Sequence, residues 1–134
     1  MLKKTIPYVD YNGVERTGTY YFNLTKSELM KKFGTGDGTV ETLQNIIDAK
    51  DGRAIMDNFE KLILSAYGEK DADGIHFNKS DAISAAFAAT PAYDILFMEL
   101  IHDDKAAADF VNGILPADIV AEAKTKLGIA PGAN

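Results

Sequence analysis

The stretch from Thr90 to Pro116 constrains this chain more than any other, because it carries more apolar surface than one exposed helix can hold. Thr90 can cap a helix, and Pro91 suits its first position, where the N–H that proline lacks would be unpaired anyway. Ile95 and Met98 extend the apolar face of this helix until little of it is polar, so it must be covered on most sides. The helical spacing itself is carried by Tyr93, Leu96, Phe97, Leu100 and Ile101.

A second helix follows directly. Asp103 and Asp104 suit its start, where negative charge meets the positive end of the helix dipole. Asn112-Gly113 tolerates a left-handed backbone, and Pro116 stops the helix or opens the next one. Its apolar face is formed by Ala107, Phe110, Val111 and Ile114. The sequence therefore predicts a helical hairpin whose apolar surface needs a cover, either from this chain or from another one.

Residues 3–24 have the pattern of a β-hairpin, with β-branched and aromatic residues on both sides of Asn12-Gly13. A two-residue turn would set Asp10 opposite Glu15, which is mildly unfavourable. A three-residue loop with Gly13 in the left-handed region would shift the register by one residue and avoid that pair. The sequence leaves both registers open. Pro7 cannot donate a ladder hydrogen bond, so its strand is expected at a sheet edge.

The remaining pattern is helical. Thr25 and Glu28 form a capping box that opens a short helix, and helical spacing from Ile55 to Tyr67 ends at Gly68, a natural stop. Further helices are expected over 39–47, 81–90 and 116–127. The sequence thus predicts one domain, residues 1–134, that is mainly α. A β-hairpin (1–24) precedes a bundle of about six or seven short helices (25–128), and residues 129–134 form a frayed tail.

Catalytic, cofactor and metal sites are not expected. The glycine-rich stretch 34–38 lacks the Gly-Lys-Ser/Thr ending of a phosphate-binding loop and is interpreted as a flexible connection. The chain has no cysteine, and its two histidines, His76 and His102, lie far apart without a neighbouring nucleophile. The alternative is a divalent-metal enzyme built on Glu69–Asp73. Because the EF-hand position for a bidentate glutamate holds Ser80, we favour a solvated turn at Asp73-Gly74, followed by a short extended piece at 75–77.

The net charge of −6 and the absence of any long run of basic residues argue against nucleic-acid binding. The N-terminus lacks the apolar run of a signal peptide, and no segment approaches the ~18 apolar residues of a membrane span. We therefore expect a protein that stays in the cytoplasm, where it is made.

Five segments, in the same order, resemble the tail assembly chaperones of long-tailed bacteriophages that infect Gram-positive bacteria. They are TIPYVDYNG (5–13), YFNLTKSEL (21–29), LILSAYG (62–68), YDILFMEL (93–100) and FVNGILP (110–116). The resemblance implies a non-enzymatic protein of the host cytoplasm that binds the tape measure protein and helps the major tail tube protein to polymerise. It also implies self-association and absence from the mature virion. The alternative is a structural head–tail connector or tail completion protein.

Part of the surface between Tyr93 and Ile114 is the hypothetical partner-binding site. Its candidate residues are Ile95, Met98, Ile101, Phe110 and Ile114. The competing interpretation is that this surface is internal core, which is favoured for Tyr93, Leu96, Phe97 and Leu100. Ile95, Met98 and Ile101 are the ones we expect to be exposed.

Overall fold

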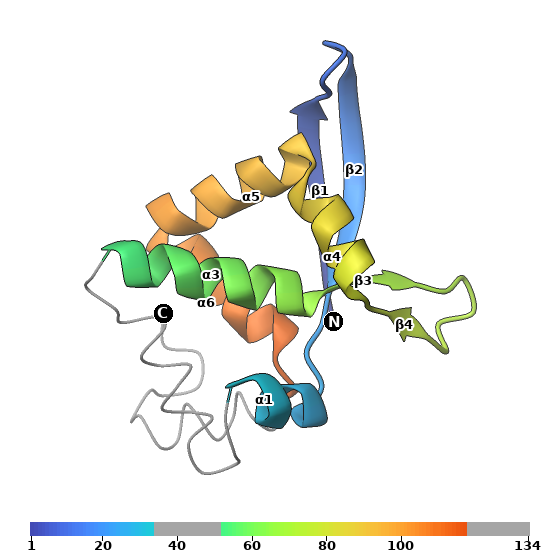
Figure 1. Cartoon of the computed structure of the whole chain (residues 1–134), viewed down its shortest axis with the longest axis vertical. Coiled ribbons are helices and arrows are strands. Elements are labelled where there is room, and N and C mark those ends of the chain that lie inside the picture. Colours follow the sequence, from blue (N-terminus) through green and yellow to red (C-terminus); the bar gives the residue numbers. More distant parts are fainter. Residues whose placement is uncertain (34–51, 118–134) are drawn as a thin grey trace.

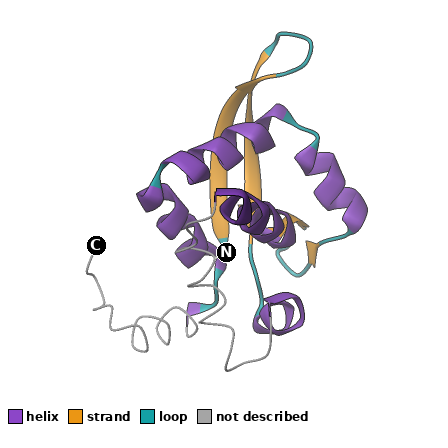
Figure 2. Cartoon of the chain, turned by 60° about the vertical axis from the view of Figure 1, so that its left-hand side comes forward, coloured by secondary structure: helices purple, strands orange, loops and turns teal. Residues whose placement is uncertain are grey.

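A computed structural model describes residues 1–33 and 52–117, in which helices pack on a four-stranded antiparallel sheet (Figure 1, Figure 2). The strands, hydrogen-bonded in chain order, are β1 (Leu2–Val9), β2 (Glu15–Phe22), β3 (Tyr67–Lys70) and β4 (Phe77–Asn78). The helices are α1 (Lys26–Phe33), α3 (Gly52–Ala66), α4 (Asp81–Ala88), α5 (Pro91–His102) and α6 (Asp104–Ile114). The interpretations of residues 34–38 and 39–47, of the last helix beyond residue 117 and of the tail 129–134 lie outside the described residues.

The expected bundle of six or seven helices after the hairpin is wrong. The described residues form five helices and a four-stranded antiparallel sheet, which is a mixed α/β fold. The difference arises at residues 67–78, where the chain adds two strands to the hairpin. Tyr67 pairs with Phe22 and Gly68 with Tyr21, because the inner edge of β2 carries backbone groups that need partners. Helix α3 therefore ends at Ala66, and Gly68 is a strand residue rather than a helix stop.

The structure selects the three-residue hairpin loop. Val9 pairs with Glu15, and the backbone N–H of Gly13 donates to the carbonyl of Asp10 over 2.9 Å. Gly13 has a φ of 81°, in the left-handed region that glycine adopts without strain. Pro7 lies in β1, at the edge of the sheet, as predicted.

Asp10 fixes this loop. Its carboxylate accepts hydrogen bonds from the backbone N–H groups of Asn12 and Val14, both over 2.9 Å, and from the side chain of Arg16. The hydrogen bond from Arg16, followed by the one from Val14, lowers the pKa of Asp10. The register that avoids setting Asp10 against Glu15 thus also gives Asp10 a cationic partner.

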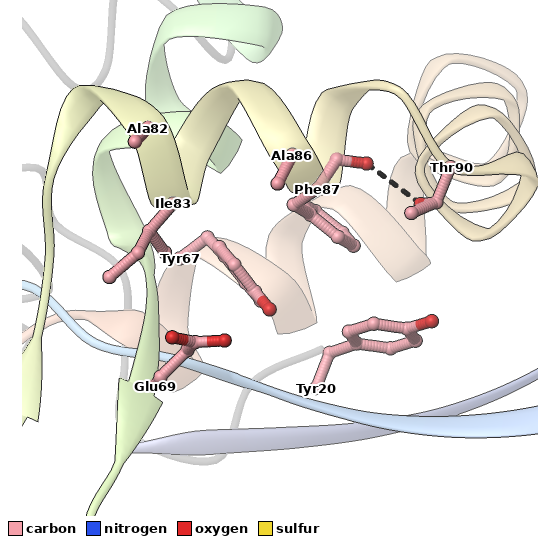
Figure 3. Close-up of a pocket in the computed structure, with 8 residues that line it drawn as sticks. All are labelled: Tyr20, Tyr67, Glu69, Ala82, Ile83, Ala86, Phe87 and Thr90. Atoms are coloured by element: carbon pink, nitrogen blue, oxygen red, sulfur yellow. Dashed lines mark hydrogen bonds between the residues drawn. The ribbon is translucent and has the colours of Figure 1, made fainter.

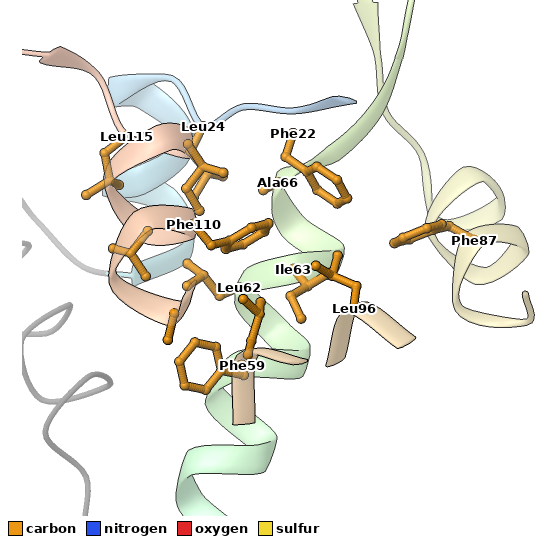
Figure 4. Close-up of a cluster of buried hydrophobic side chains, with 14 of the residues drawn as sticks. Phe22, Leu24, Phe59, Leu62, Ile63, Ala66, Phe87, Leu96, Phe110 and Leu115 are labelled. Atoms are coloured by element: carbon orange, nitrogen blue, oxygen red, sulfur yellow. The ribbon is translucent and has the colours of Figure 1, made fainter. Parts of the chain in front are cut away.

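The core lies between the helices and one face of the sheet. Along β1 the even-numbered side chains are buried or half-buried and the odd-numbered ones are exposed, as alternation requires. Phe22 is fully buried and its ring lies 5.7 Å from Phe87 and 5.3 Å from Phe110, so strand β2 contacts α4 and α6 through one side chain (Figure 4). Other fully buried members of the core are Leu24, Leu29, Leu62, Ile63, Leu96, Leu100 and Ile114.

The predicted helical hairpin of α5 and α6 is confirmed, including both caps. The Thr90 hydroxyl accepts from the backbone N–H of Tyr93, and the Asp103 carboxylate accepts from the first turn of α6. The expected left-handed turn at Asn112-Gly113 is wrong, since both residues lie inside α6. Gly113 instead allows close packing against β1, because a Cβ atom there would come within 2.9 Å of the Leu2 side chain.

Lys79, in the connection between β4 and α4, joins three distant parts of the chain. Its half-buried ammonium group donates to the carbonyl of Asn23 over 2.6 Å, to that of Ser65 over 2.8 Å and to the Glu28 carboxylate over 2.8 Å. These acceptors belong to the β2–α1 corner, the end of α3 and helix α1. One side chain therefore satisfies carbonyls that the strands and helices leave unpaired.

Glu28 has two roles, because it also completes the predicted capping box with Thr25. The Thr25 backbone N–H donates to Glu28 over 2.9 Å, and the Glu28 N–H donates back to the Thr25 hydroxyl. Burial acts to raise the pKa of Glu28, but the hydrogen bonds from Lys79 and Thr25 outweigh it and leave the pKa lowered. Burial, the largest influence, and the charge of Lys32 leave the pKa of Lys79 lowered, although Glu28 raises it.

Glu28→Gln should therefore destabilise the fold in a pH-dependent way. Glutamine keeps the capping acceptor and removes only the charge, so we expect a loss of about 1–2 kcal/mol in the free energy of unfolding near neutral pH. Because the folded-state pKa is lowered, the contribution of Glu28 is complete above its ordinary value of 4.5 and disappears as the pH falls through the lowered one. The difference between the two proteins should shrink accordingly in urea denaturation series run at falling pH.

Asp109→Asn is the matched control, since Asp109 pairs with Lys105 over 3.1 Å with both side chains largely exposed. This variant should differ from the parent by less than about 0.5 kcal/mol at every pH. Equal effects of the two substitutions would show that the Lys79 contact is no more stabilising than a surface pair.

Candidate functional site

The five residues predicted to bind a partner fall into two groups. Ile95 and Met98 are exposed, at 40% and 42% of their surface, and Ile101 is half-buried against the core. Phe110 and Ile114 are buried at 2% and 0%, so in this fold both belong to the core between α6 and the sheet. The accessible part of the predicted site therefore lies on α5.

Helical geometry explains this division. Ala92, Leu96 and Leu100 are four residues apart and form the buried line of α5. Met98 follows Leu96 by two residues, about 200° around the helix, and so points away from the core. Tyr93 and Phe97 lie between these two directions and are half-buried, packed against the core.

A residue of α3 that the sequence analysis did not single out, Met56, extends this surface; it is exposed at 44%. Helices α3 and α5 pack together and run in opposite directions (Figure 1). Burial, and then the charge of Glu60 on α3, raises the pKa of Tyr93 near the start of α5 to about 12. Met56 lies one turn before Glu60, so in this antiparallel pair we expect it further along α5 than Tyr93, on the side of Phe97 and Ile101. We call Met56, Phe97, Met98 and Ile101 the methionine seam.

Three exposed carboxylates lie near the methionine seam, and the exposed cation beside them, Lys61, donates to the Lys32 carbonyl over 2.9 Å. Asp57 and Glu60 are exposed on α3, and Asp94 is exposed on α5. Within residues 1–33 and 52–117, none of these three carboxylates forms an ion pair. Glu99, by contrast, is engaged by Lys4 of β1 over 3.3 Å.

A hollow of about 350 Å³ lies between α4 and the sheet (Figure 3). Burial, and then a hydrogen bond with Tyr8, raises the pKa of Tyr20 to about 12, so this hydroxyl stays protonated at neutral pH. The Thr90 hydroxyl donates to the Phe87 carbonyl over 2.7 Å rather than into the hollow. The lining residues, which include one carboxylate, are Tyr20, Tyr67, Glu69, Ala82, Ile83, Ala86, Phe87 and Thr90. This composition provides an apolar recess without a pairing of nucleophile and base.

The acidic stretch Glu69–Asp73, considered above as a metal site, stabilises the β3–β4 hairpin. Asp71 binds His76 and Asn78, each over 2.9 Å, and Asp73 accepts from the backbone N–H of Ile75. Gly74, with a φ of 77°, closes the predicted turn by donating to the Asp71 carbonyl. No group of three or more metal-binding side chains comes together in the described ranges. The carboxylates here are occupied by the turn itself.

Within the two described ranges, no single helix is long and apolar enough to cross a bilayer. Helices α4 and α5 together have the length and composition, but they are bent by 80° at their junction.

The family model for "Phage tail assembly chaperone" matches residues 1–131, which is nearly the whole chain. This chain belongs to the phage tail assembly chaperones. No curated protein and no solved structure matches it. The prediction of a phage tail assembly chaperone from five short segments is thereby confirmed, and the Gram-positive host stays a prediction.

Family membership places the chaperone in the assembly of phage tails inside the host cell and fits interaction with tail proteins. It suggests a non-enzymatic role. A surface of exposed apolar side chains that is kept on a folded scaffold is what such a role requires. The methionine seam is therefore the candidate contact surface of the chaperone.

The geometry of the seam can be tested by cross-linking, because the chaperone has no cysteine of its own. In a Met56→Cys/Phe97→Cys variant, a short bismaleimide should join the two thiols within one chain, since packed helices have axes about 8–10 Å apart. Peptide mass spectrometry would identify the linked pair. An Ile75→Cys/Phe97→Cys variant should stay unlinked, and the reverse pattern would contradict the seam.

Proposed function

We propose that the chaperone binds the tape measure protein of its phage and keeps that protein soluble until the major tail tube protein polymerises around it. The observation that carries this proposal is a set of exposed apolar side chains on α3 and α5 in a member of the tail assembly chaperone family. A tape measure protein is expected to be a long helical chain with uncovered apolar stripes. Such stripes bind to apolar surfaces of other helices.

The size of the contact suits a chaperone that must let its partner go. Fully burying an exposed methionine or isoleucine side chain is worth roughly 1.5–3 kcal/mol, and covering the 40–44% of Ile95, Met98 and Met56 that is exposed supplies less than half of that for each. Association itself costs several kcal/mol in lost freedom of motion. A few such side chains therefore support binding that is specific but reversible. The net charge of −6 keeps the complex in solution by mutual repulsion of its copies.

We propose a wider role together with this contact. The chaperone acts in the cytoplasm of a Gram-positive host, associates with further copies of itself, and leaves before the virion is complete. Mass spectrometry of purified particles separates this role from that of a head–tail connector or tail completion protein. The chaperone should be missing from mature particles, whereas a structural component would be present in fixed stoichiometry.

A Met56→Gln/Met98→Gln variant tests the contact surface. Because both side chains are exposed, the variant should fold with a stability close to that of the parent. Co-expressed with the tape measure protein, it should leave most of that protein insoluble, whereas the parent keeps it in the soluble fraction. The amount of soluble tape measure protein, read from a pull-down on the tagged chaperone, is the measurement.

Met30→Gln/Ile75→Gln is the matched control, because these two side chains are also exposed, at 52% and 74%, but lie outside α3 and α5. It should retain the tape measure protein as the parent does. If the parent itself fails to retain that protein, the proposed function is wrong. If both variants behave like the parent, the function stands and the surface is wrong.

A further inference from the structure

We propose that the methionine seam and the acidic residues around it form a docking surface for an amphipathic helix whose apolar stripe is flanked by lysine or arginine. This inference rests on the proposed function, because the tape measure protein is the source of that helix. It goes further in naming the chemistry of the segment that is recognised.

The apolar part of the surface has the spacing of a helix. Phe97 and Ile101 are one turn apart on α5, about 6 Å, and α3, which carries the exposed Met56, packs against α5. Apolar residues at i and i+4 of a partner helix have nearly the same separation. Met56 and Met98 are exposed, unbranched and flexible. Methionine adapts its shape to different partners, so the seam can accept successive apolar stripes along a long helical protein.

The carboxylates near the seam favour a partner helix with basic residues on both sides of its apolar stripe. Asp57, Glu60 and Asp94 are exposed, and none is paired with a cation in the described part of the chain. A docked helix with glutamates beside its stripe would bring like charges together, whereas lysines or arginines would meet three free carboxylates. Complementary charge mainly adds selectivity and a faster encounter, and it weakens with salt.

Several other carboxylates of the chain already have partners. Glu99 binds Lys4 and Asp109 binds Lys105, so these acidic groups already have cations. Asp71 binds His76 and Asn78 in its own hairpin. Other exposed carboxylates, such as Glu15 and Asp81, are also without an ion pair in the described residues, but Asp57, Glu60 and Asp94 lie on the two helices that carry the exposed apolar side chains.

Two synthetic peptides of about 20 residues provide the test, both with the same leucine stripe at helical spacing. One carries lysines beside the stripe and the other carries glutamates. At low salt the lysine peptide should bind the full chain at least about tenfold more tightly than the glutamate peptide, measured by fluorescence anisotropy, and the ratio should fall as salt is added.

An Asp57→Lys/Asp94→Lys variant should reverse this preference. Glu15→Lys/Asp109→Lys changes the net charge equally at exposed positions on the hairpin and on α6, and it should keep the preference of the parent. Met56→Gln/Met98→Gln should weaken the binding of both peptides. Equal affinity of the parent for the two peptides, or reversal by the control variant as well, overturns the proposal.

These outcomes are separate from the fate of the proposed function. A parent chain that retains the tape measure protein but does not distinguish the peptides keeps its function and loses the charge selectivity. A parent chain that distinguishes the peptides but does not retain the tape measure protein has the docking surface. Its helix would then come from another protein, which contradicts the assignment of the tape measure protein as the partner.

Discussion

The burial of Phe22 is the constraint on which the described fold depends. This residue ends β2, pairs with Leu2 on one side and with Tyr67 on the other, and has no exposed surface. Its ring contacts Phe87 of α4 and Phe110 of α6. Because Tyr67 also stacks on Phe87, with ring centres 4.2 Å apart, the sheet and two helices share one aromatic cluster. The helical hairpin of α5 and α6 obtains its cover from this sheet and from α3, within the same chain, and only the outer side of α5 is left over.

Local signals account for the parts of the fold that the sequence predicted well. Thr90, Asp103 and the Thr25–Glu28 capping box each act within three residues, and all of them cap helices in the structure. The sequence did not predict the second half of the sheet, because the pairing of β3 with β2 is not local. Tyr67 continues the helical spacing of α3, yet its strand partner is Phe22, far back in the chain. The role of Lys79 was equally hidden, since its acceptors come from residues 23, 28 and 65.

The same distinction applies to the candidate site. The exposure of Ile95 and Met98 follows from helical spacing and could be predicted. The burial of Phe110 and Ile114 depends on where the sheet lies, and the contribution of Met56 depends on how α3 packs beside α5. Neither arrangement has a signal in the local sequence. What emerges is a surface made by two helices, apolar along its centre and acidic at its edges, which suits non-covalent shielding of another protein's helices.

The chain contains four methionines, two in the seam and two elsewhere, and this distribution permits a direct test. In methyl NMR of the methionine-labelled chaperone, addition of the tape measure protein should shift or broaden the signals of Met56 and Met98 and leave those of Met1 and Met30 nearly unchanged. Perturbation of Met1 or Met30 with Met56 and Met98 unaffected, or no perturbation at all, would contradict the account.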